Sequence, residues 1–207
     1  MLLDQNEKTL FFKLWFALLE YVNETHNIIP QFGKLALGKV NVPFKDLAKV
    51  RNALWNNPGW ADDFLAKYDN DEFTNEERAI IVSWRKHHIH GRFIVYKHLT
   101  NHSVLMPFEG KPAFYCVHGL MEPLADVLRY PTPLLATTTL LPFKGRIVWD
   151  GVATTPDISF GPGYRAIFHE LYNNAKRQSG IVKTLPPRRA RRKTGQPECP
   201  EGDGGSI

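Results

Sequence analysis

The sequence predicts an α+β protein with a helical N-terminal half, a small antiparallel sheet of paired β-hairpins or an open barrel, and a packed C-terminal helix. Three observations predict it. Apolar residues repeat at helical spacing before residue 90, β-branched and aromatic residues follow Gly91, and an amphipathic pattern precedes Gly180. We therefore expect a helical region at 1–90, a β region with its closing helix at 91–180, and a disordered basic tail at 181–207.

Four helices are predicted in the helical region. The first has an apolar face too wide for an exposed helix, which predicts a central position. Pro43 suits the first turn of the second helix, because its missing N–H needs no partner there. Thr74 and Glu77 form a capping-box sequence at the start of the fourth. The apolar positions are Leu10, Phe11, Leu14, Trp15, Leu18, Leu19 and Val22, then Phe44, Leu47, Val50 and Leu54, then Trp60, Phe64, Leu65 and Tyr68, and last Ile80, Ile81 and Trp84.

The β region contains an internal repeat. Residues 105–111 (LMPFEGK) match residues 140–146 (LLPFKGR), 35 positions later. Proline fixes φ and glycine can adopt a positive φ, so each copy predicts a strand–turn–strand hairpin. Chance similarity between two apolar hairpins is the alternative, because true repeat arrays have three or more copies. The predicted strands are 93–99, 103–108, 113–118, 134–141, 146–149 and a short one at 158–160; brief and closing helices are predicted at 122–128 and 164–178.

The composition indicates a soluble, folded, cytoplasmic protein. Of 207 residues, 43% are hydrophobic and 23% are charged, which excludes collagen-like, coiled-coil and wholly disordered chains. The longest uncharged apolar run, near 134–143, is far shorter than the roughly 20 residues of a membrane span. Acidic residues near the start oppose a signal-peptide plan. Cys116 and Cys199 are too few and too far apart for a disulfide framework, which favours a reducing compartment.

The basic character of the chain is concentrated in its tail. From Ile181 onward six cations stand against three acids, so this segment carries +3 of the net charge of +5. A flexible cationic run can neutralise phosphates, with a steep salt dependence. No aromatic residues interleave to stack on bases, so a merely solubilising tail stands beside this interpretation, and membrane-surface attachment is a weaker third. The predicted nucleic-acid-binding residues are Lys183, Arg188, Arg189, Arg191, Arg192 and Lys193.

The first predicted function is therefore a non-enzymatic interaction or regulatory module that contacts nucleic acid or another acidic partner through this tail, and a protein partner is also open. The alternative is an enzyme of unknown class with a pocket between the helical and β regions. His118 and Asp150 each precede a glycine at a predicted strand end and could form an acid–base pair; His169 is another partner for Asp150. No serine or cysteine stands in a nucleophile-elbow context, so no reaction is selected.

Two further motifs are candidate binding sites. His87, His88 and His90 cluster, with His98 and His102 nearby, and three imidazoles plus water can form a catalytic zinc site. The His-His-Ile-His spacing splays the rings and includes no carboxylate, so we predict neither a metal nor a cofactor. Gly-Pro-Gly at 161–163 could present a helix N-terminus to an anion with help from Arg165. Without a third glycine or a P-loop lysine, a tight turn is the preferred interpretation.

The stretch LLPFKGRIVWDG at 140–151, followed by ISFG at 158–161 and a helix from Tyr164, resembles an uncharacterised family of bacterial proteins. The resemblance implies a helical half before a small β region and brings no activity with it. Some relatives carry a C-terminal SEC-C zinc motif, to which residues 195–204 are similar. Here Glu201 stands where the second cysteine of Cys-Pro-Cys-Gly is expected, and a lone Cys199 thiolate cannot form a tetrahedral zinc site.

Overall fold

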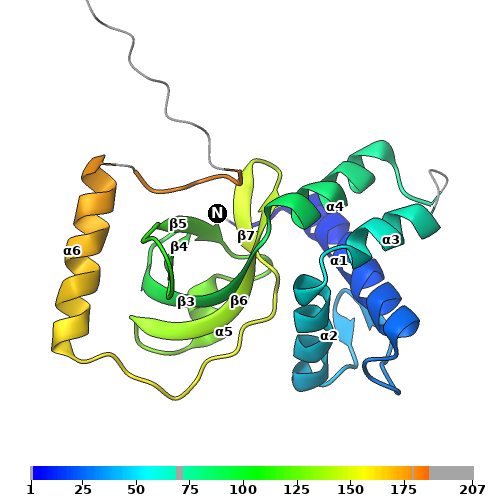
Figure 1. Cartoon of the computed structure of the whole chain (residues 1–207), viewed down its shortest axis with the longest axis horizontal. Helices are drawn as coiled ribbons and strands as arrows, with labels where there is room; N and C mark the ends of the chain where they lie inside the picture. Colours follow the sequence, from blue (N-terminus) through cyan, green and yellow to red (C-terminus); the bar gives the residue numbers. More distant parts are fainter. Residues whose placement is uncertain (1, 69–71, 179, 187–207) are drawn as a thin grey trace, which may run out of the picture.

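The computed structural model describes residues 2–68, 72–178 and 180–186. They form three parts: a helical layer, a five-stranded barrel and a single helix on the far side of the barrel (Figure 1). The predicted α+β class and the closing helix are confirmed. Within the described ranges, no helix is long and apolar enough to cross a membrane.

The helical layer consists of α1 (Gln5–His26), α2 (Phe44–Asn56), α3 (Trp60–Lys67) and α4 (Asn75–His87). The central position predicted for α1 is confirmed, because it packs against the other three helices. The predicted capping box at Thr74 and Glu77 is present, and a second one, Asp4 with Glu7, starts α1.

A small hairpin interrupts the otherwise helical region. Strands β1 (Leu35–Ala36) and β2 (Lys39–Val40) pair antiparallel between α1 and α2. The sequence analysis does not predict them, because two-residue strands are too short to show an alternating pattern. Gly38, with φ of +80°, occupies their turn in a conformation that favours glycine.

The barrel is closed by five strands in the order β3-β4-β5-β7-β6. The sequence predicts an antiparallel sheet or an open barrel. The barrel is instead closed, because β3 also pairs with β6, and it is not wholly antiparallel, because β5 and β7 run parallel. Closure gives every strand two neighbours and leaves no unpaired edge. The short strand expected at 158–160 is a single bridge from Ser159 to Leu134. The elements are β3 (Ile89–His98), β4 (Ser103–Pro107), β5 (Tyr115–His118), α5 (Leu124–Leu128), β6 (Leu134–Phe143) and β7 (Arg146–Trp149).

Both copies of the sequence repeat form hairpins, as predicted. Strands β4 and β5 pair antiparallel, and so do β6 and β7. Lys144 and Gly145 both have positive φ in the two-residue turn between β6 and β7, the conformation that matches strand twist in short hairpins. The two hairpins join through the parallel β5–β7 pair, with Val117 opposite Ile147. The strand order, with a helix between the third and fourth strands, is that of the oligonucleotide/oligosaccharide-binding (OB) barrel.

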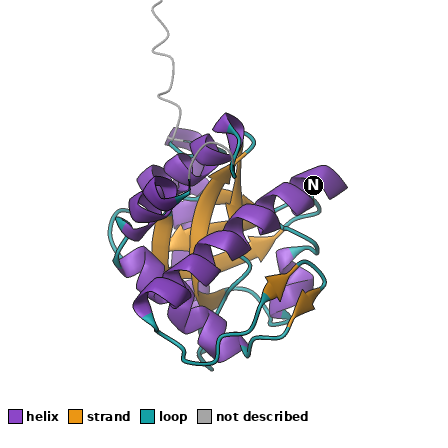
Figure 2. Cartoon of the chain, turned by 90° about the vertical axis from the view of Figure 1, so that its right-hand side faces the viewer, coloured by secondary structure: helices purple, strands orange, loops and turns teal. Residues whose placement is uncertain are grey.

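The helical layer packs against one side of the barrel (Figure 2), with α4 against β6. The Phe11 ring lies 5.2 Å from that of Trp84 and 5.3 Å from that of Phe143, and all three side chains are buried. The Trp84 indole N–H donates to the Pro142 carbonyl at 2.9 Å. One hydrophobic core therefore runs from the helical layer into the barrel.

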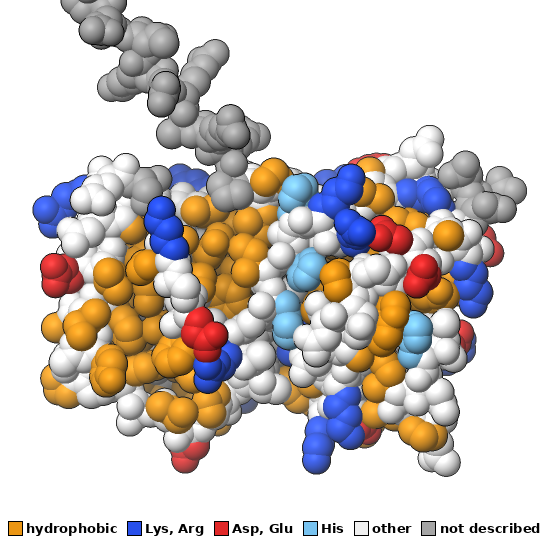
Figure 3. Space-filling view, viewed as in Figure 1, with side chains coloured by type: hydrophobic (Ala, Val, Ile, Leu, Met, Phe, Trp, Pro, Cys, Tyr) orange, Lys and Arg blue, Asp and Glu red, His pale blue; other side chains and the backbone are white. Residues whose placement is uncertain are grey.

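Helix α6 (Pro162–Gln178) covers the outer face of β3 and β4 through a separate, smaller core. Only Phe168 and Tyr172 of this helix are buried, against Ile94, Val104 and Met106 among others. Apolar side chains gather between α6 and the barrel in Figure 3. The cover on this face is thus one helix with a narrow contact.

The segment after α6 returns to the barrel. Val182 bonds to both Phe114 and Cys116 through backbone groups, and it bridges Tyr115 in parallel. Leu185 is buried in the main core. Residues 181–186, which the sequence analysis assigns to the disordered tail, therefore belong to the packed body, whereas residues 187–207 lie outside the described ranges.

Candidate functional site

The space between the helical layer and the barrel, where the enzyme alternative places a pocket, holds a buried ion pair. Arg51 of α2 and Asp150 after β7 are both fully buried, and the guanidinium donates to the carboxylate at 2.9 Å. Thr138 and the Val152 N–H also donate to Asp150, at 3.2 and 3.0 Å. Burial raises the pKa of the Asp150 carboxyl, and Arg51 and these hydrogen bonds oppose the rise. A carboxylate so enclosed binds the two layers together and is closed to a substrate.

His90 belongs to the same buried cluster. Its Nδ1 lies 2.9 Å from Thr139 Oγ1, which also accepts from Arg51 at 3.2 Å. Burial, helped by the charges of Arg51 and His88, lowers the pKa of His90 to about 4. Its imidazole is therefore neutral near pH 7, and Arg51 carries the positive charge of the cluster.

The structure places His118 in a different environment from Asp150. His118 lies beside Cys116, with its Nε2 at 3.7 Å from the Sγ atom, and its ring is 5.9 Å from that of His102. His169, the other candidate, lies on α6, where its Nδ1 is 2.9 Å from the Tyr96 hydroxyl. In each acid–base pair suggested by the sequence, Asp150 therefore lies in the closed interface, whereas its histidine partner lies at the barrel surface.

The remaining sequence candidates have structural roles. Arg165 donates to the Phe160 carbonyl at 2.9 Å and the Thr132 carbonyl at 3.4 Å, which fits the tight turn preferred for Gly-Pro-Gly. His88 stacks on Trp55, with ring centroids 4.3 Å apart. Over the described part of the chain, no three His, Cys, Asp or Glu residues lie close enough together to hold a metal ion.

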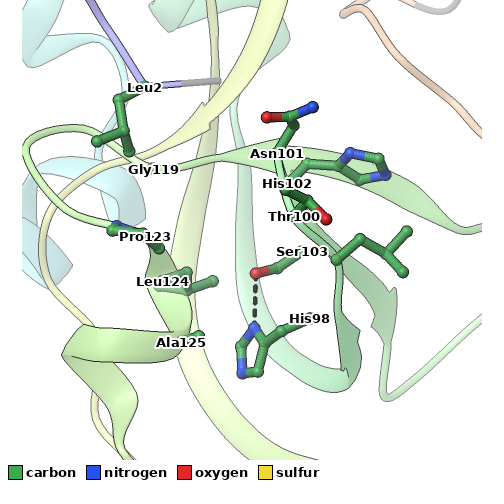
Figure 4. Close-up of a pocket in the computed structure, with 11 residues that line it drawn as sticks. Leu2, His98, Thr100, Asn101, His102, Ser103, Gly119, Pro123, Leu124 and Ala125 are labelled. Carbon is green, nitrogen blue, oxygen red and sulfur yellow. Dashed lines mark hydrogen bonds between the residues drawn. The ribbon is translucent and has the colours of Figure 1, made fainter.

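An accessible site lies at the β3–β4 loop (Figure 4). A cavity of about 210 Å³ is enclosed by that loop and by the connection from β5 to α5. The apolar part of its lining includes Leu2, Leu99 and Leu124, and the polar part includes His98, His102 and Ser103. The sequence places His98 and His102 near the cluster of three histidines, but it does not predict a cavity between them and α5.

His98 is the polar centre of this cavity. Its Nδ1 lies 2.7 Å from Ser103 Oγ, while its Nε2 is buried and has no hydrogen-bond partner in the described part of the chain. Burial lowers the pKa of His98, and the charge of Asp126 opposes the shift. Figure 4 shows His98 and Ser103 across from Leu124 and Ala125 of α5. His98 therefore lines the cavity as a neutral imidazole whose Nδ1 is engaged by Ser103 and whose Nε2 is enclosed.

Gly119 allows the two walls of the cavity to approach each other. A Cβ atom at this position would meet the Glu122 carbonyl oxygen at 2.2 Å and the Leu2 side chain at 2.8 Å. Only glycine fits there without moving the backbone, so the connection after β5 can turn sharply into α5.

Two lysines lie near His102, one of the residues that line the cavity. The pKa of His102 is lowered by burial and also by the nearby charges of Lys183 and Lys97. Lys183 is exposed, and it follows the bridge that runs parallel to β5. The described chain therefore heads toward the His118 end of β5, next to the cavity-lining Gly119. The other predicted tail residues, Arg188, Arg189, Arg191, Arg192 and Lys193, lie outside the described ranges.

No family model matches the chain, and no curated protein or solved structure is significantly similar to it. The resemblance to a bacterial family stays a prediction. Function must accordingly be inferred from the cavity, the cations around it and the arrangement of the strands.

Proposed function

We propose that the protein is a non-enzymatic nucleic-acid-binding module in which the basic tail and the β3–β4 end of the barrel act together. The position of Lys183 carries this proposal. It is the first cation of the predicted tail, and it lies along β5 on a segment that heads toward the cavity. The five remaining tail cations follow it within ten positions in the sequence.

The electrostatics of this end of the barrel support phosphate contact. Lys97 and Lys183 both act on His102, so positive groups from β3 and from the last described segment converge there. Lys97 also lies over the Tyr172 ring, with its Nζ 3.9 Å from the ring centroid. Contacts between lysine side chains and phosphates hold a nucleic acid in place without reading its sequence.

The strand order supports the same location. OB barrels bind oligonucleotides over their second and third strands and at two loops, the first and the fourth. In this chain α6 covers the second barrel strand, β4, and the fourth loop is also covered, because Lys144 pairs with Glu76 and Arg146 with Glu7 of the helical layer. The first loop, at 99–102, lines the cavity instead. Strand order alone does not set function, so the cations beside this loop are needed for the proposal.

The test is fluorescence anisotropy of the full chain with a labelled single-stranded oligonucleotide, over about 50 to 300 mM salt. Each phosphate contact contributes a slope of about −0.7 to log K against log salt for single strands. We expect a steep decline, with a slope of up to about −4 if all six tail cations make contacts. Absence of binding at the lowest salt, or an affinity independent of salt, would falsify the proposal.

A matched pair of variants separates the tail from net charge. One replaces three tail cations (Arg189→Gln, Arg191→Gln and Arg192→Gln), and the other replaces three exposed lysines of the helical region (Lys34→Gln, Lys39→Gln and Lys45→Gln). We expect the tail variant to flatten the salt slope by about 2 and the control to leave it unchanged. Equal effects would mean that only net charge matters, against the proposal.

A further inference from the structure

We infer that the cavity beside the β3–β4 loop receives one unpaired base of a single-stranded nucleic acid. The inference rests on the proposed function and names the class of ligand that the site takes. Three properties of the cavity support it: its size, the mixed chemistry of its walls, and the cations at its rim.

The size of the cavity suits a single flat ring system. Its volume of about 210 Å³ is below the roughly 300–1,000 Å³ of pockets for larger ligands. A base pair cannot enter so small a space, and a base held in a duplex must first leave its stack and its partner. The cavity therefore selects a strand whose bases are already free.

The walls combine apolar surface with hydrogen-bonding atoms. Leu2, Leu99 and Leu124 offer apolar contact for the faces of a ring. His102 contributes an imidazole to the lining, and Ser103 contributes a hydroxyl group. A neutral imidazole presents either a donor or an acceptor, depending on its tautomer, and a hydroxyl group can adapt to either. Base edges carry both kinds of group, so this pair complements one of them.

The charge distribution places the phosphates outside the cavity. His98 and His102 both have lowered pKa values, chiefly because of burial, so the imidazoles that line the cavity are neutral near pH 7. The permanent cations Lys97 and Lys183 act on His102 from outside the lining. A neutral base inside and charged backbone groups at the rim match this pattern, whereas a free phosphate ion inside the cavity does not.

The test compares single-stranded and duplex oligonucleotides of equal length, bound to the full chain at one salt concentration. The variant Ala125→Phe fills the cavity from α5, and Ala66→Phe places the same ring at an exposed position of α3. We expect tighter binding of the single strand, a loss of about tenfold for Ala125→Phe, and no change for Ala66→Phe. The salt slope should be the same in all three proteins, because the cations are untouched.

The outcomes distinguish this inference from the proposed function. If a folded Ala125→Phe variant binds the single strand as tightly as the parent chain does, or if duplex binds equally well, the cavity is not a base site, although the tail can still bind nucleic acid. If no nucleic acid binds at low salt, both proposals fail. Circular dichroism establishes folding. Should Ala125→Phe not fold, His102→Leu decides, because it removes the other lining imidazole: an unchanged affinity for the single strand overturns the inference.

Discussion

Two regions of the barrel carry the same kind of half-buried polar pair and differ in what lies beside it. At the helical interface, His90 Nδ1 lies 2.9 Å from Thr139 Oγ1, and at the β3–β4 loop, His98 Nδ1 lies 2.7 Å from Ser103 Oγ. The first pair contacts a fully buried Arg51. The second lines an accessible cavity and leaves the His98 Nε2 atom unpartnered within the described ranges.

The difference follows from what covers each region. The helical layer packs Phe11 and Trp84 against Phe143, so polar groups beneath it lose water. Nη1 of Arg51 is paired there, whereas its Nε and Nη2 atoms have no partner among the described residues. The loop at 99–102 has a cavity beside it instead. Residue type alone therefore does not assign a role to a histidine: the same imidazole–hydroxyl pair lies against a buried ion pair in one place and lines a cavity in the other.

Breaking the closed region should have the largest effect. Asp150→Asn keeps the shape of the side chain but removes its charge, which leaves Arg51 buried without a counter-ion. We expect a loss of about 3–5 kcal/mol in the free energy of unfolding, measured by urea denaturation.

The matched control is Asp62→Asn, which removes the charge from an exposed pair with Arg85 and should cost about 0–1 kcal/mol. Replacing both buried partners, Arg51→Met with Asp150→Leu, should recover much of the loss, because no unpaired charge remains. Similar costs for Asp150→Asn and Asp62→Asn would show that the interface is not closed to water.

A second variant tests how firmly the open region is built. Gly119→Ala should cost about 1–3 kcal/mol, because its methyl group would overlap the Glu122 carbonyl and force the cavity wall to move. Gly59→Ala is the control, since a Cβ there meets nothing within 4 Å and its φ of −61° suits alanine. Urea denaturation of both variants measures the difference, and equal stabilities would mean that the wall adapts freely.

Acid should weaken the closed region more than the open one. Below pH 6.5 a histidine in the unfolded chain binds a proton, whereas native His90, with its pKa lowered to about 4, stays neutral until about pH 4. The contribution of neutral His90 to stability is therefore complete above pH 6.5 and falls as the pH drops toward 4. Urea denaturation at pH 7.5, 5.5 and 4.5 should show this fall. His90→Gln should flatten it clearly and His98→Gln less; an unchanged profile in His90→Gln would contradict the assignment.

The smallest effect on stability is expected at Lys183, where the informative measurement is oligonucleotide binding. The side chain is exposed, so Lys183→Gln should change the free energy of unfolding by less than about 0.5 kcal/mol. The same substitution should reduce the magnitude of the salt slope for single-stranded oligonucleotides by about 0.7, the value for one phosphate contact. An unaltered slope in the anisotropy titration would remove Lys183 from the proposed interface.

Local patterns predicted the elements well, because their cause is local. The apolar spacing of α1, the capping box of α4 and the strand at 146–149 all depend on neighbours within a few positions. Barrel closure depends instead on pairings such as Ile89 with Leu140, which no short pattern contains. The predicted helical region ends at residue 90, whereas β3 starts at Ile89 and continues through Gly91.

The candidate site was less predictable than the fold. The sequence suggests Asp150 as half of an acid–base pair with a histidine, whereas its partner in the fold is Arg51, 99 positions away, and both side chains are buried. The cavity needs Leu2, the loop at 99–102 and the turn at Gly119 to meet in space. The chemistry of these residues is visible in the sequence, whereas their proximity is a property of the closed barrel.

The contact between α1 and the β6–β7 hairpin also constrains how the chain folds. Glu7 pairs with Arg146, 139 positions later, and Phe11 packs against Phe143. Contacts of such high sequence separation require the closure of a long loop before they return any stabilisation, which slows folding. The four helices can gather early as neighbours along the chain, but their docking must wait until the second hairpin has left the ribosome.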